Sequence, residues 1–387
     1  MENIAGKSVT AGLELTYAAL LSMAICLFAV PIAQRLKVID FPDKGRKVHP
    51  GPTPLVGGIA IMAPLVLWCI VRIVSVDITN PNKLFVAIVL GGGAVAVTGL
   101  LDDQRHISAG ARLLLLALVA GAALTIDPLL VGDHINTVSW GVVSIPIWLF
   151  AFLVILALVG YPSAVNMADG MNGIVVSLFF IWAACIAFTS TGSIAATARV
   201  IAIVTAVTFL FNLRGRLFLG DCGAFGVAFT LGLLTVADHN AAHLPVETVV
   251  VWYFIPVVDC FRQMLSRWIR GESPLKPDNN HFHHRLTRLF GPHAARFIYV
   301  GLVAGSSLAA TFVPWLGPIC VGLLALAYLV LLRPDLVGWH PRVAAPQMRP
   351  AKAPTLENQY PAIPTIVPQK LPLRPVAQDR ETNRTLQ

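Results

Sequence analysis

Long apolar runs dominate this chain and decide what it can fold into. A helix needs about twenty apolar residues to cross roughly 30 Å of hydrocarbon. Only 12% of the residues are charged, against about 25% in a soluble domain. The sequence therefore predicts an all-α integral membrane protein with about eleven transmembrane helices. The expected spans are approximately 13–33, 55–74, 84–101, 111–126, 144–161, 174–190, 195–212, 222–237, 247–265, 295–314 and 317–332.

The distribution of lysine and arginine predicts the orientation. With the N-terminus outside, sixteen of these residues fall on the cytoplasmic side and four outside, and the other eight follow residue 332. Cytoplasmic loops normally carry this excess. The net charge of +8 is therefore explained by topology, and we expect no nucleic-acid partner. Arg35 and Lys37 follow the first apolar run, so it is expected to be an uncleaved span.

The chain divides by composition into two parts. Residues 1–332 hold the apolar runs and are expected to form one polytopic membrane domain. Residues 333–387 contain 10 of the 27 prolines and are expected to form a disordered cytoplasmic tail. The six cysteines are scattered without paired spacing, which argues against a disulfide framework or a zinc site.

Three acidic motifs fall at the predicted cytoplasmic ends of spans. Asp102 and Asp103 end the third span, and Asp169 follows the fifth in the segment Asn166 to Gly173. Asp221 precedes the eighth in Phe-Leu-Gly-Asp-Cys-Gly. Acids at a membrane boundary usually have a function or a partner. The structural alternatives are a solvated pair beside Arg105, a polar turn, and a helix cap.

Two basic segments belong to the same predicted face. Lys47 and His49 lie in a basic loop before Pro-Thr-Pro-Leu-Val-Gly-Gly, and the histidines at 281, 283 and 284 are followed by two arginines. The histidine spacing matches no zinc pattern, so we interpret this cluster as a phosphate site. Ordinary loop charge and incidental histidines are the alternatives.

Together these segments provide carboxylates for a cation and cations for phosphates in one aqueous layer. Mg²⁺ is typically bound by one or two protein carboxylates and by substrate phosphates. The combination predicts transfer of a phosphoryl group whose acceptor lies in the bilayer. A transporter of anionic sugars or nucleotides is the main alternative, but it would need polar groups near mid-membrane. A structural scaffold would leave the acids unexplained.

The motifs also resemble a known family, the polyprenyl-phosphate N-acetylhexosamine-1-phosphate transferases. The similarity runs from about residue 35 to residue 290 and rests on five motifs in the family's order. The His281-x-His283-His284 form is similar to the WecA-type branch, which uses UDP-N-acetylglucosamine or a close relative. The motifs are Arg-Lys-Val-His with Pro-x-x-Gly-Gly (residues 46–49 and 54–58), Asp102-Asp103, Asn166-x-x-Asp169-Gly170, Phe218-Leu219-Gly220-Asp221 and His281-x-His283-His284.

The resemblance implies a reaction and a set of roles. Undecaprenyl phosphate would attack a UDP-N-acetylhexosamine, with Mg²⁺ or alternatively Mn²⁺, to give undecaprenyl-diphosphate-sugar and UMP at the bacterial inner membrane. Asp102 or Asp103 would activate the lipid phosphate, Asp221 would hold the metal, and Asp169 would support both catalysis and metal binding. The residues expected to bind substrate are Lys47, His49, Asn166, Asn172, Asn212, Arg262, His281, His283 and His284.

The chain departs from the family pattern at two positions. Asn172 replaces the acid that many bacterial relatives carry near the uracil, and Ala224 replaces a usual serine. An amide oxygen can still accept a hydrogen bond from uracil N3–H, so a uridine donor remains the expectation. The identity of the sugar, the downstream glycan and the existence of a homodimer are left open by the sequence.

Overall fold

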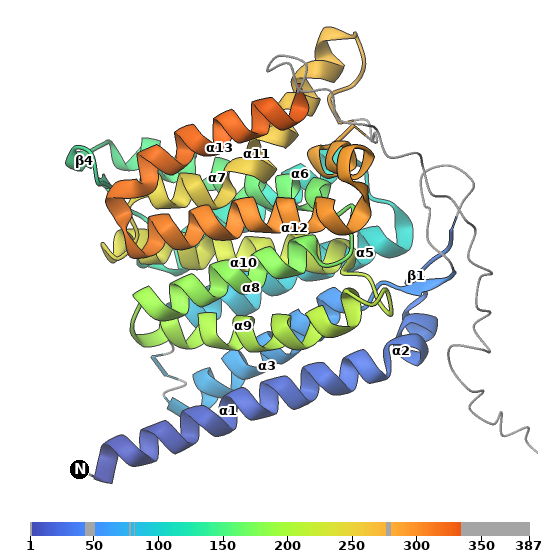
Figure 1. The fold of residues 1–387 in the computed structure, drawn as a ribbon. Helices are drawn as coiled ribbons and strands as arrows, with labels where there is room; N and C mark the ends of the chain where they lie inside the picture. Colours follow the sequence, from blue (N-terminus) through green and yellow to red (C-terminus); the bar gives the residue numbers. More distant parts are fainter. Residues whose placement is uncertain (1, 43–50, 77–78, 81, 276–279, 334–387) are drawn as a thin grey trace, which may run out of the picture.

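The structure is a computed structural model that describes residues 2–42, 51–76, 79–80, 82–275 and 280–333. Helices form most of this part of the chain (Figure 1). The prediction of an all-α multi-pass membrane protein is confirmed. The helices are α1 (Glu2–Leu27), α2 (Ala29–Leu36), α3 (Gly57–Val76), α4 (Lys83–Ala87), the π-helix η1 (Ile88–Gly92), α5 (Gly93–Arg105), α6 (Ala109–Ile126), the 3₁₀ helix η2 (Pro128–Leu130), α7 (Ile147–Ala168), α8 (Ile174–Thr189), α9 (Gly192–Asn212), α10 (Gly220–Asn240), α11 (Val246–Ile269), α12 (Phe282–Phe312), the 3₁₀ helix η3 (Pro314–Leu316) and α13 (Gly317–Leu332).

Each predicted span falls on a helix, but the count of eleven is not confirmed. In the described part of the chain, 9 helices are long and apolar enough to cross a membrane, and the pair α1 and α2, bent by 70°, makes up to 10. The apolar helix α8 has only 16 residues. At about 1.5 Å per residue it is shorter than the roughly 30 Å of hydrocarbon.

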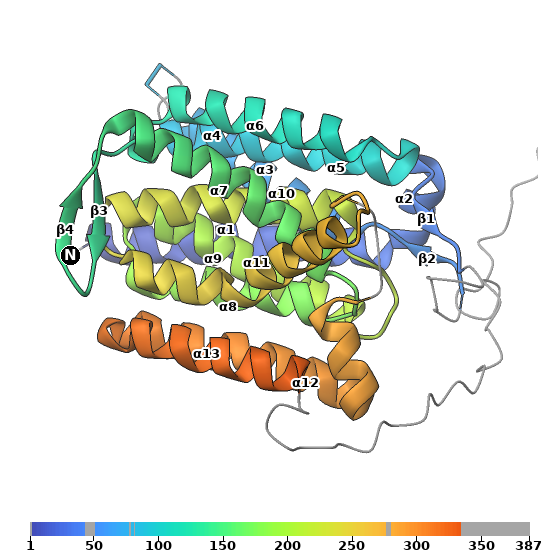
Figure 2. The ribbon, with the colours of Figure 1, turned by 90° about the horizontal axis from the view of Figure 1, so that it is seen from above.

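Helix α10 lies at the centre of the bundle and is buried along almost its whole length (Figure 2). It packs against α3, α5, α7, α8 and α9. Glycines allow the closest of these approaches: a Cβ at Gly58 would collide with the backbone of Gly223, and a Cβ at Gly99 with the backbone of Asp221. Small residues are the usual means by which membrane helices pack closely. Here they hold the starts of α3 and α10 and the end of α5 together.

Short antiparallel strand pairs mark the two ends of the bundle (Figure 1). At one end, β1 (Ile39–Asp40) pairs with β2 (Thr53–Pro54) beside α2. At the other end, β3 (His134–Thr137) pairs with β4 (Gly141–Ser144). The sequence predicted no strands, because neither pair is long enough to show a clear alternation of apolar and polar residues.

Two helix boundaries differ from the sequence expectation in ways that affect the site. Helix α7 continues to Ala168, so Asn166 lies on its last turn rather than in a loop. Helix α12 begins at Phe282, thirteen residues before the expected span, and bends at Gly291, which has a φ of 80° and is followed by Pro292. The apolar pattern that predicted this span begins only after Gly291 and Pro292, a pair that normally interrupts a helix. The polar residues before this pair are nevertheless helical.

Candidate active site

Asp103 lies at the N-terminus of α10 and joins two of the acidic motifs. Its carboxylate oxygens accept hydrogen bonds from the backbone N–H groups of Asp221 at 3.0 Å and Cys222 at 3.2 Å. The first N–H groups of a helix have no partner within the helix, and its dipole favours a negative charge there. Gly220 has a φ of 70°, and a Cβ there would lie 2.8 Å from Asp103 Oδ2. The family-like Gly-Asp pair therefore places Asp221 directly beside Asp103.

Asp102 is buried and held by two partners. One carboxylate oxygen accepts from the backbone N–H of Ile107 at 2.7 Å, and the other forms an ion pair with Arg112 on α6. The same guanidinium group lies 3.6 Å from Asp221 Oδ2 and 4.8 Å from the centre of the Phe225 ring. One cation is thus shared between two carboxylates. Arg112 was not among the residues singled out from the sequence.

Asp169 follows α7 and brings the third acidic motif to the same place. Burial and, as the smaller cause, the nearby Asp103 carboxylate together raise the pKa of its carboxyl to about 7. Asp221 interacts electrostatically with both Asp102 and Asp103. Four carboxyl groups from α5, α7 and α10 therefore form a carboxylate cluster: Asp102, Asp103, Asp169 and Asp221. Like charges this close favour a bound cation.

The amide side chains predicted to bind substrate are divided between two environments. Asn212 is buried: its Oδ1 accepts from the backbone N–H of Gly173 at 2.7 Å, and its Nδ2 donates to the carbonyl of Leu217 at 3.1 Å. It therefore positions the loops after α7 and α9, and direct contact with a substrate stays a prediction. Asn172 is partly exposed and lies close to Gly215 in the loop after α9. A Cβ added to Gly215 would be 3.3 Å from Nδ2 of Asn172.

The basic loop is only partly described. Lys47 and His49 lie outside the described residues. The segment that follows them is hydrogen-bonded to the chain just before α10. The backbone N–H of Gly57 donates to the carbonyl of Phe218 at 2.9 Å, and that of Gly58 to the carbonyl of Leu219 at 2.8 Å. This pairing places the exit of the basic loop beside the start of α10.

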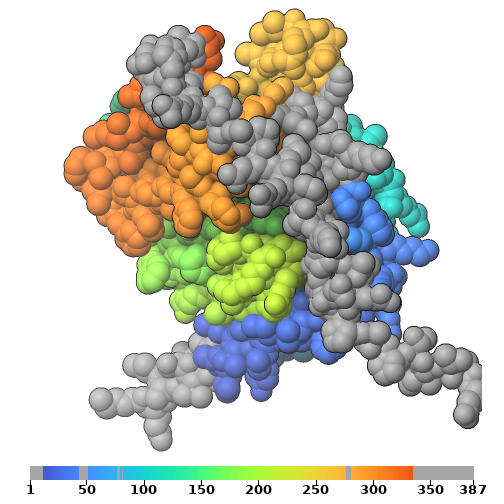
Figure 3. Space-filling model, turned by 45° about the vertical axis from the view of Figure 1, so that its right-hand side comes forward, coloured from blue at the N-terminus to red at the C-terminus, as the bar shows by residue number. Residues whose placement is uncertain are grey.

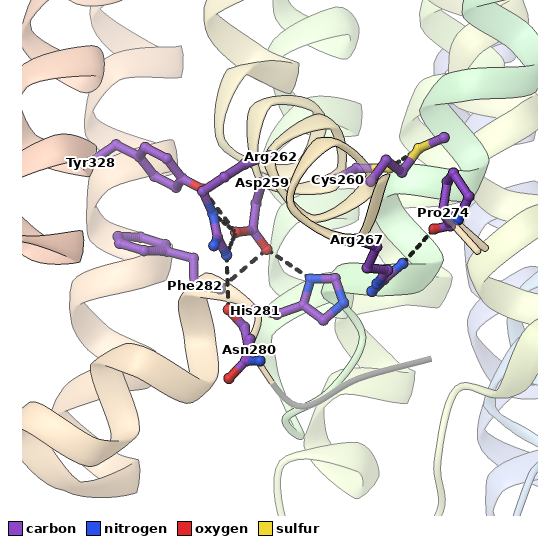
Figure 4. A network of polar contacts seen from close by, with 10 residues as sticks. Asp259, Cys260, Arg262, Arg267, Pro274, Asn280, His281, Phe282 and Tyr328 are labelled. Carbon is purple, nitrogen blue, oxygen red and sulfur yellow. Dashed lines mark hydrogen bonds and ion pairs between the residues drawn. The ribbon is translucent and has the colours of Figure 1, made fainter. Parts of the chain in front are cut away.

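The histidine motif is anchored by Asp259, an acid on α11 (Figure 4). Asp259 Oδ2 lies 2.8 Å from Nδ1 of His281 and accepts the backbone N–H of Phe282 at 3.1 Å. Its Oδ1 accepts hydrogen bonds from Arg262 Nη2 and from the Tyr328 hydroxyl, both at 2.8 Å. This Asp259 network fixes the start of α12 against α11 and α13. Within it, Arg262 is held by the protein and remains partly exposed.

Asp259 was missed by the sequence analysis although a signal existed. It is an acid inside an apolar span, and Arg262 follows it by three residues on the same helix face. An ionisable residue in such a span usually pairs with another charged or polar group. The partner could be inferred from spacing, but the contacts to residues 281 and 328 could not.

His283 connects the histidine motif to the carboxylate cluster. It is buried, and neither ring nitrogen has a hydrogen-bond partner in the described structure. A Cβ on Gly170, the residue after Asp169, would collide with this ring. The ring is stacked on that of His281 with centroids 5.8 Å apart, and the His284 ring is 4.2 Å away. Two unsatisfied polar atoms in a buried ring indicate a ligand-facing position, because such groups are costly when unpaired.

The carboxylate cluster fits Mg²⁺ better than a metal with a closed protein cage. Among the described residues, no group of three or more His, Cys, Asp or Glu side chains is arranged as a ligand set. Asp103 is occupied by backbone N–H groups and Asp102 by Ile107 and Arg112. Asp169 and Asp221 are the carboxylates with oxygens left for an ion. Mg²⁺ often takes one or two carboxylates and completes its shell with phosphates and water.

Comparison with known proteins finds one matching family model and several similar proteins that are named as sugar-phosphate transferases acting on polyprenyl phosphates. Residues 85–238 match the model of the family described as glycosyl transferase family 4. The undecaprenyl-phosphate alpha-N-acetylglucosaminyl 1-phosphate transferase of Yersinia pestis is 28% identical over 314 residues, which cover 76% of this chain and 82% of that protein. The protein of the same name from Escherichia coli strain K12 is 27% identical over 315 residues, with the same coverage. The decaprenyl-phosphate N-acetylglucosaminephosphotransferase of Mycolicibacterium smegmatis is 26% identical over 352 residues, covering 77% and 82%.

Proposed function

We propose that this chain, which belongs to the polyprenyl-phosphate N-acetylhexosamine-1-phosphate transferase family, transfers N-acetylglucosamine 1-phosphate from UDP-N-acetylglucosamine to undecaprenyl phosphate. The products are undecaprenyl-diphosphate-N-acetylglucosamine and UMP. The single observation that carries the proposal is the meeting of the carboxylate cluster and the histidine motif at one end of the helix bundle, where His283 packs on the Asp169–Gly170 loop. The names of the similar proteins support the same reaction.

The reaction exchanges one phosphorus–oxygen bond for another. An oxygen of the lipid phosphate attacks the β-phosphorus of the nucleotide sugar, and the bond from that phosphorus to the bridging oxygen breaks as UMP leaves. Little covalent chemistry is required of the protein, so positioning and charge stabilisation dominate catalysis. The site must therefore bring three negatively charged phosphates together and offset their repulsion.

Mg²⁺ is the proposed cofactor, with Asp221 and Asp169 as the residues that would hold it. When bound, it would neutralise diphosphate charge that develops during transfer. Asp103 holds the N-terminus of α10 and thereby the position of Asp221. Asp102 shares Arg112 with Asp221, so the guanidinium limits repulsion between them in the absence of an ion. Activation of the lipid phosphate by Asp102 or Asp103 stays a prediction.

The histidine motif is the proposed diphosphate site. His283 offers two ring nitrogens without protein partners, and His284 lies beside it. Arg262 and His281 keep this segment in place through Asp259. The neighbouring amides Asn166 and Asn172 would contact the nucleoside part of the donor, and Lys47 and His49 would contact phosphate.

The membrane supplies the second substrate. The chain is a multi-pass membrane protein, and the site lies at the ends of its helices rather than at their middle. A polyprenyl chain can stay in the bilayer while its phosphate reaches such a site. We place this end on the cytoplasmic side of the bacterial inner membrane, because its predicted loops carry the excess of lysine and arginine. UDP-sugars are soluble donors and would approach from that side.

A reconstituted assay tests the proposal. The purified full chain in lipid vesicles would receive undecaprenyl phosphate, Mg²⁺ and UDP-[¹⁴C]N-acetylglucosamine. We expect equimolar UMP and labelled lipid, loss of both with EDTA, and loss of both in Asp221→Asn. Asp133→Asn, the same chemical change at an exposed position near the opposite end, is the matched control and should keep full activity.

Other results would redirect or reject the assignment. Labelled lipid from UDP-N-acetylgalactosamine alone would change the sugar but keep the reaction. Uptake of an intact UDP-sugar without release of UMP would indicate the transporter. Absence of labelled lipid with every UDP-sugar tested, from a protein that is folded and inserted, would reject the proposed function.

A further inference from the structure

A second positively charged site lies where α11, α12 and α13 meet. A pocket there is lined by five arginines: Arg262, Arg270, Arg285, Arg288 and Arg333. No acidic side chain of the described residues lines it, and none of the four residues of the carboxylate cluster does. We call it the arginine pocket. It shares Arg262 with the residues predicted to bind substrate and lies at the same end of the bundle as the carboxylate cluster.

The charge of the arginine pocket is only partly balanced. Arg262 pairs with Asp259 at 2.8 Å and Arg270 pairs with Glu272 at 3.4 Å. Arg285 and Arg288 form no ion pair with any residue between 280 and 333 or elsewhere in the described chain. Nε of Arg285 is buried and has no hydrogen-bond partner. A buried guanidinium nitrogen without a partner is costly, and a bound anion would satisfy it.

Exposed apolar side chains lie on the two helices that flank the arginine pocket. Phe261, Leu265 and Trp268 on α11 are exposed, Trp268 by 69%. Leu326 and Leu329 on α13 are exposed as well. The segment around residue 270, drawn in gold, projects beyond the rest of the molecule (Figure 3). Exposed tryptophan next to arginine is typical of the interface between hydrocarbon and headgroups.

We propose that the arginine pocket binds the phosphate of an anionic phospholipid headgroup, with the acyl chains lying on the apolar faces of α11 and α13. Basic pockets between transmembrane helices on the cytoplasmic side are suited to such headgroups. Inorganic phosphate would satisfy the arginines but would leave the neighbouring apolar faces unused. The proposal concerns a binding site and does not depend on the transferase reaction.

Binding at this site would also act on the histidine motif. Arg262 lines the arginine pocket and donates to both Asp259 and the carbonyl of Asn280, which precedes His281. A phosphate on the other arginines would hold the start of α12 against α11. We therefore expect the lipid to stabilise this region of the folded protein.

Lipid binding to the purified full chain gives a direct test. Dioleoyl phosphatidylglycerol would be titrated into the detergent-solubilised protein and bound lipid counted by native mass spectrometry. The pocket variant is Arg285→Gln with Arg288→Gln. The control is Arg214→Gln with Arg216→Gln, which removes the same charge from exposed positions at the same end. The pocket variant should bind phosphatidylglycerol at least about tenfold more weakly, and the control should stay within about twofold of wild type.

Several outcomes would overturn the proposal. Equal affinity of the wild type and the pocket variant would do so, as would equal retention of zwitterionic phosphatidylcholine. Displacement of the lipid by inorganic phosphate at about 10 mM, too dilute to screen the arginines strongly, would indicate a free-phosphate site. Preferential retention of undecaprenyl phosphate would assign the pocket to the acceptor instead.

Two further variants test whether weaker lipid binding is caused by misfolding. Arg288→Gln alone changes an exposed side chain without an ion-pair partner among the described residues, so it should unfold at the wild-type temperature and still weaken lipid binding. Arg285→Lys with Arg288→Lys keeps the charge and should recover most of the affinity. Failure of the lysine variant to recover it, together with normal unfolding, would mean that charge is not what holds the lipid.

Discussion

The carboxylate cluster and the Asp259 network both bury acidic charge at the same end of the bundle, but they balance it differently. Asp259 has partners for both oxygens: a guanidinium, an imidazole, a hydroxyl and a backbone N–H group. Among the described residues, the cluster has four carboxyl groups and one cation paired with them, Arg112. Buried charge that is fully paired holds a structure together, whereas buried charge that is under-balanced is suited to bind an ion or a substrate.

Replacing Asp221 should give the largest loss of turnover and tests whether the carboxylate cluster binds an ion. Asp221→Asn removes a proposed metal ligand but keeps the size of the side chain. We expect turnover to fall by at least about a hundredfold, which corresponds to roughly 2.7 kcal/mol or more of transition-state stabilisation. The Mg²⁺ concentration for half-activity should rise. Near-normal activity and Mg²⁺ dependence would show that the cluster is not a metal site.

Replacing Asp259 should affect stability more than Mg²⁺ dependence. Asp259→Asn leaves Arg262 and His281 without their charged partner. We expect about 2 kcal/mol of destabilisation, seen as a lower unfolding temperature in detergent, with turnover reduced by about tenfold because the histidine motif loses its anchor. The Mg²⁺ concentration for half-activity should not change. If Asp259→Asn raised the Mg²⁺ concentration for half-activity as much as Asp221→Asn does, the two regions would not differ in their relation to the metal.

Asn172 offers a smaller change next to the carboxylate cluster. Asn172→Asp introduces the acid that the resemblance described above implies at this position, so we expect the chain to tolerate it. We expect KM for the UDP-sugar to change by less than about tenfold and kcat to remain close to wild type, because the contact would be made equally in the bound and transition states. Complete loss of turnover in a folded variant would show that the amide has a different and essential role.

Removing the tail should give the smallest effect. The described residues of both regions all precede Arg333, and residues 334–387 lie outside the described structure. A chain ending at Pro334 should keep transfer activity within about twofold, measured as labelled lipid per inserted protein. A large loss would mean that the tail contributes to one of the two regions after all.

The kind of protein and the chemistry of its motifs can be read from the amino-acid sequence alone. Apolar runs of membrane length need no tertiary information, because crossing hydrocarbon is a local requirement of each helix. The acids at 102, 103, 169 and 221 and the histidine motif could be selected for the same reason: charge at a span end is conspicuous in the chain itself. Contact between these motifs was expected only from their shared side of the membrane.

Which of these groups are paired, and which are left for a ligand, depends on how the helices pack. Asp103 caps a helix that begins 117 residues later, at Gly220, Asn212 holds a loop 39 residues before it, and Asp259 meets Tyr328 at a separation of 69 residues. Such contacts depend on how helices pack, and neither apolar periodicity nor motif spacing encodes helix packing. The early start of α12 has the same origin, because packing on Asp259 keeps a polar segment helical where its own pattern predicted a loop.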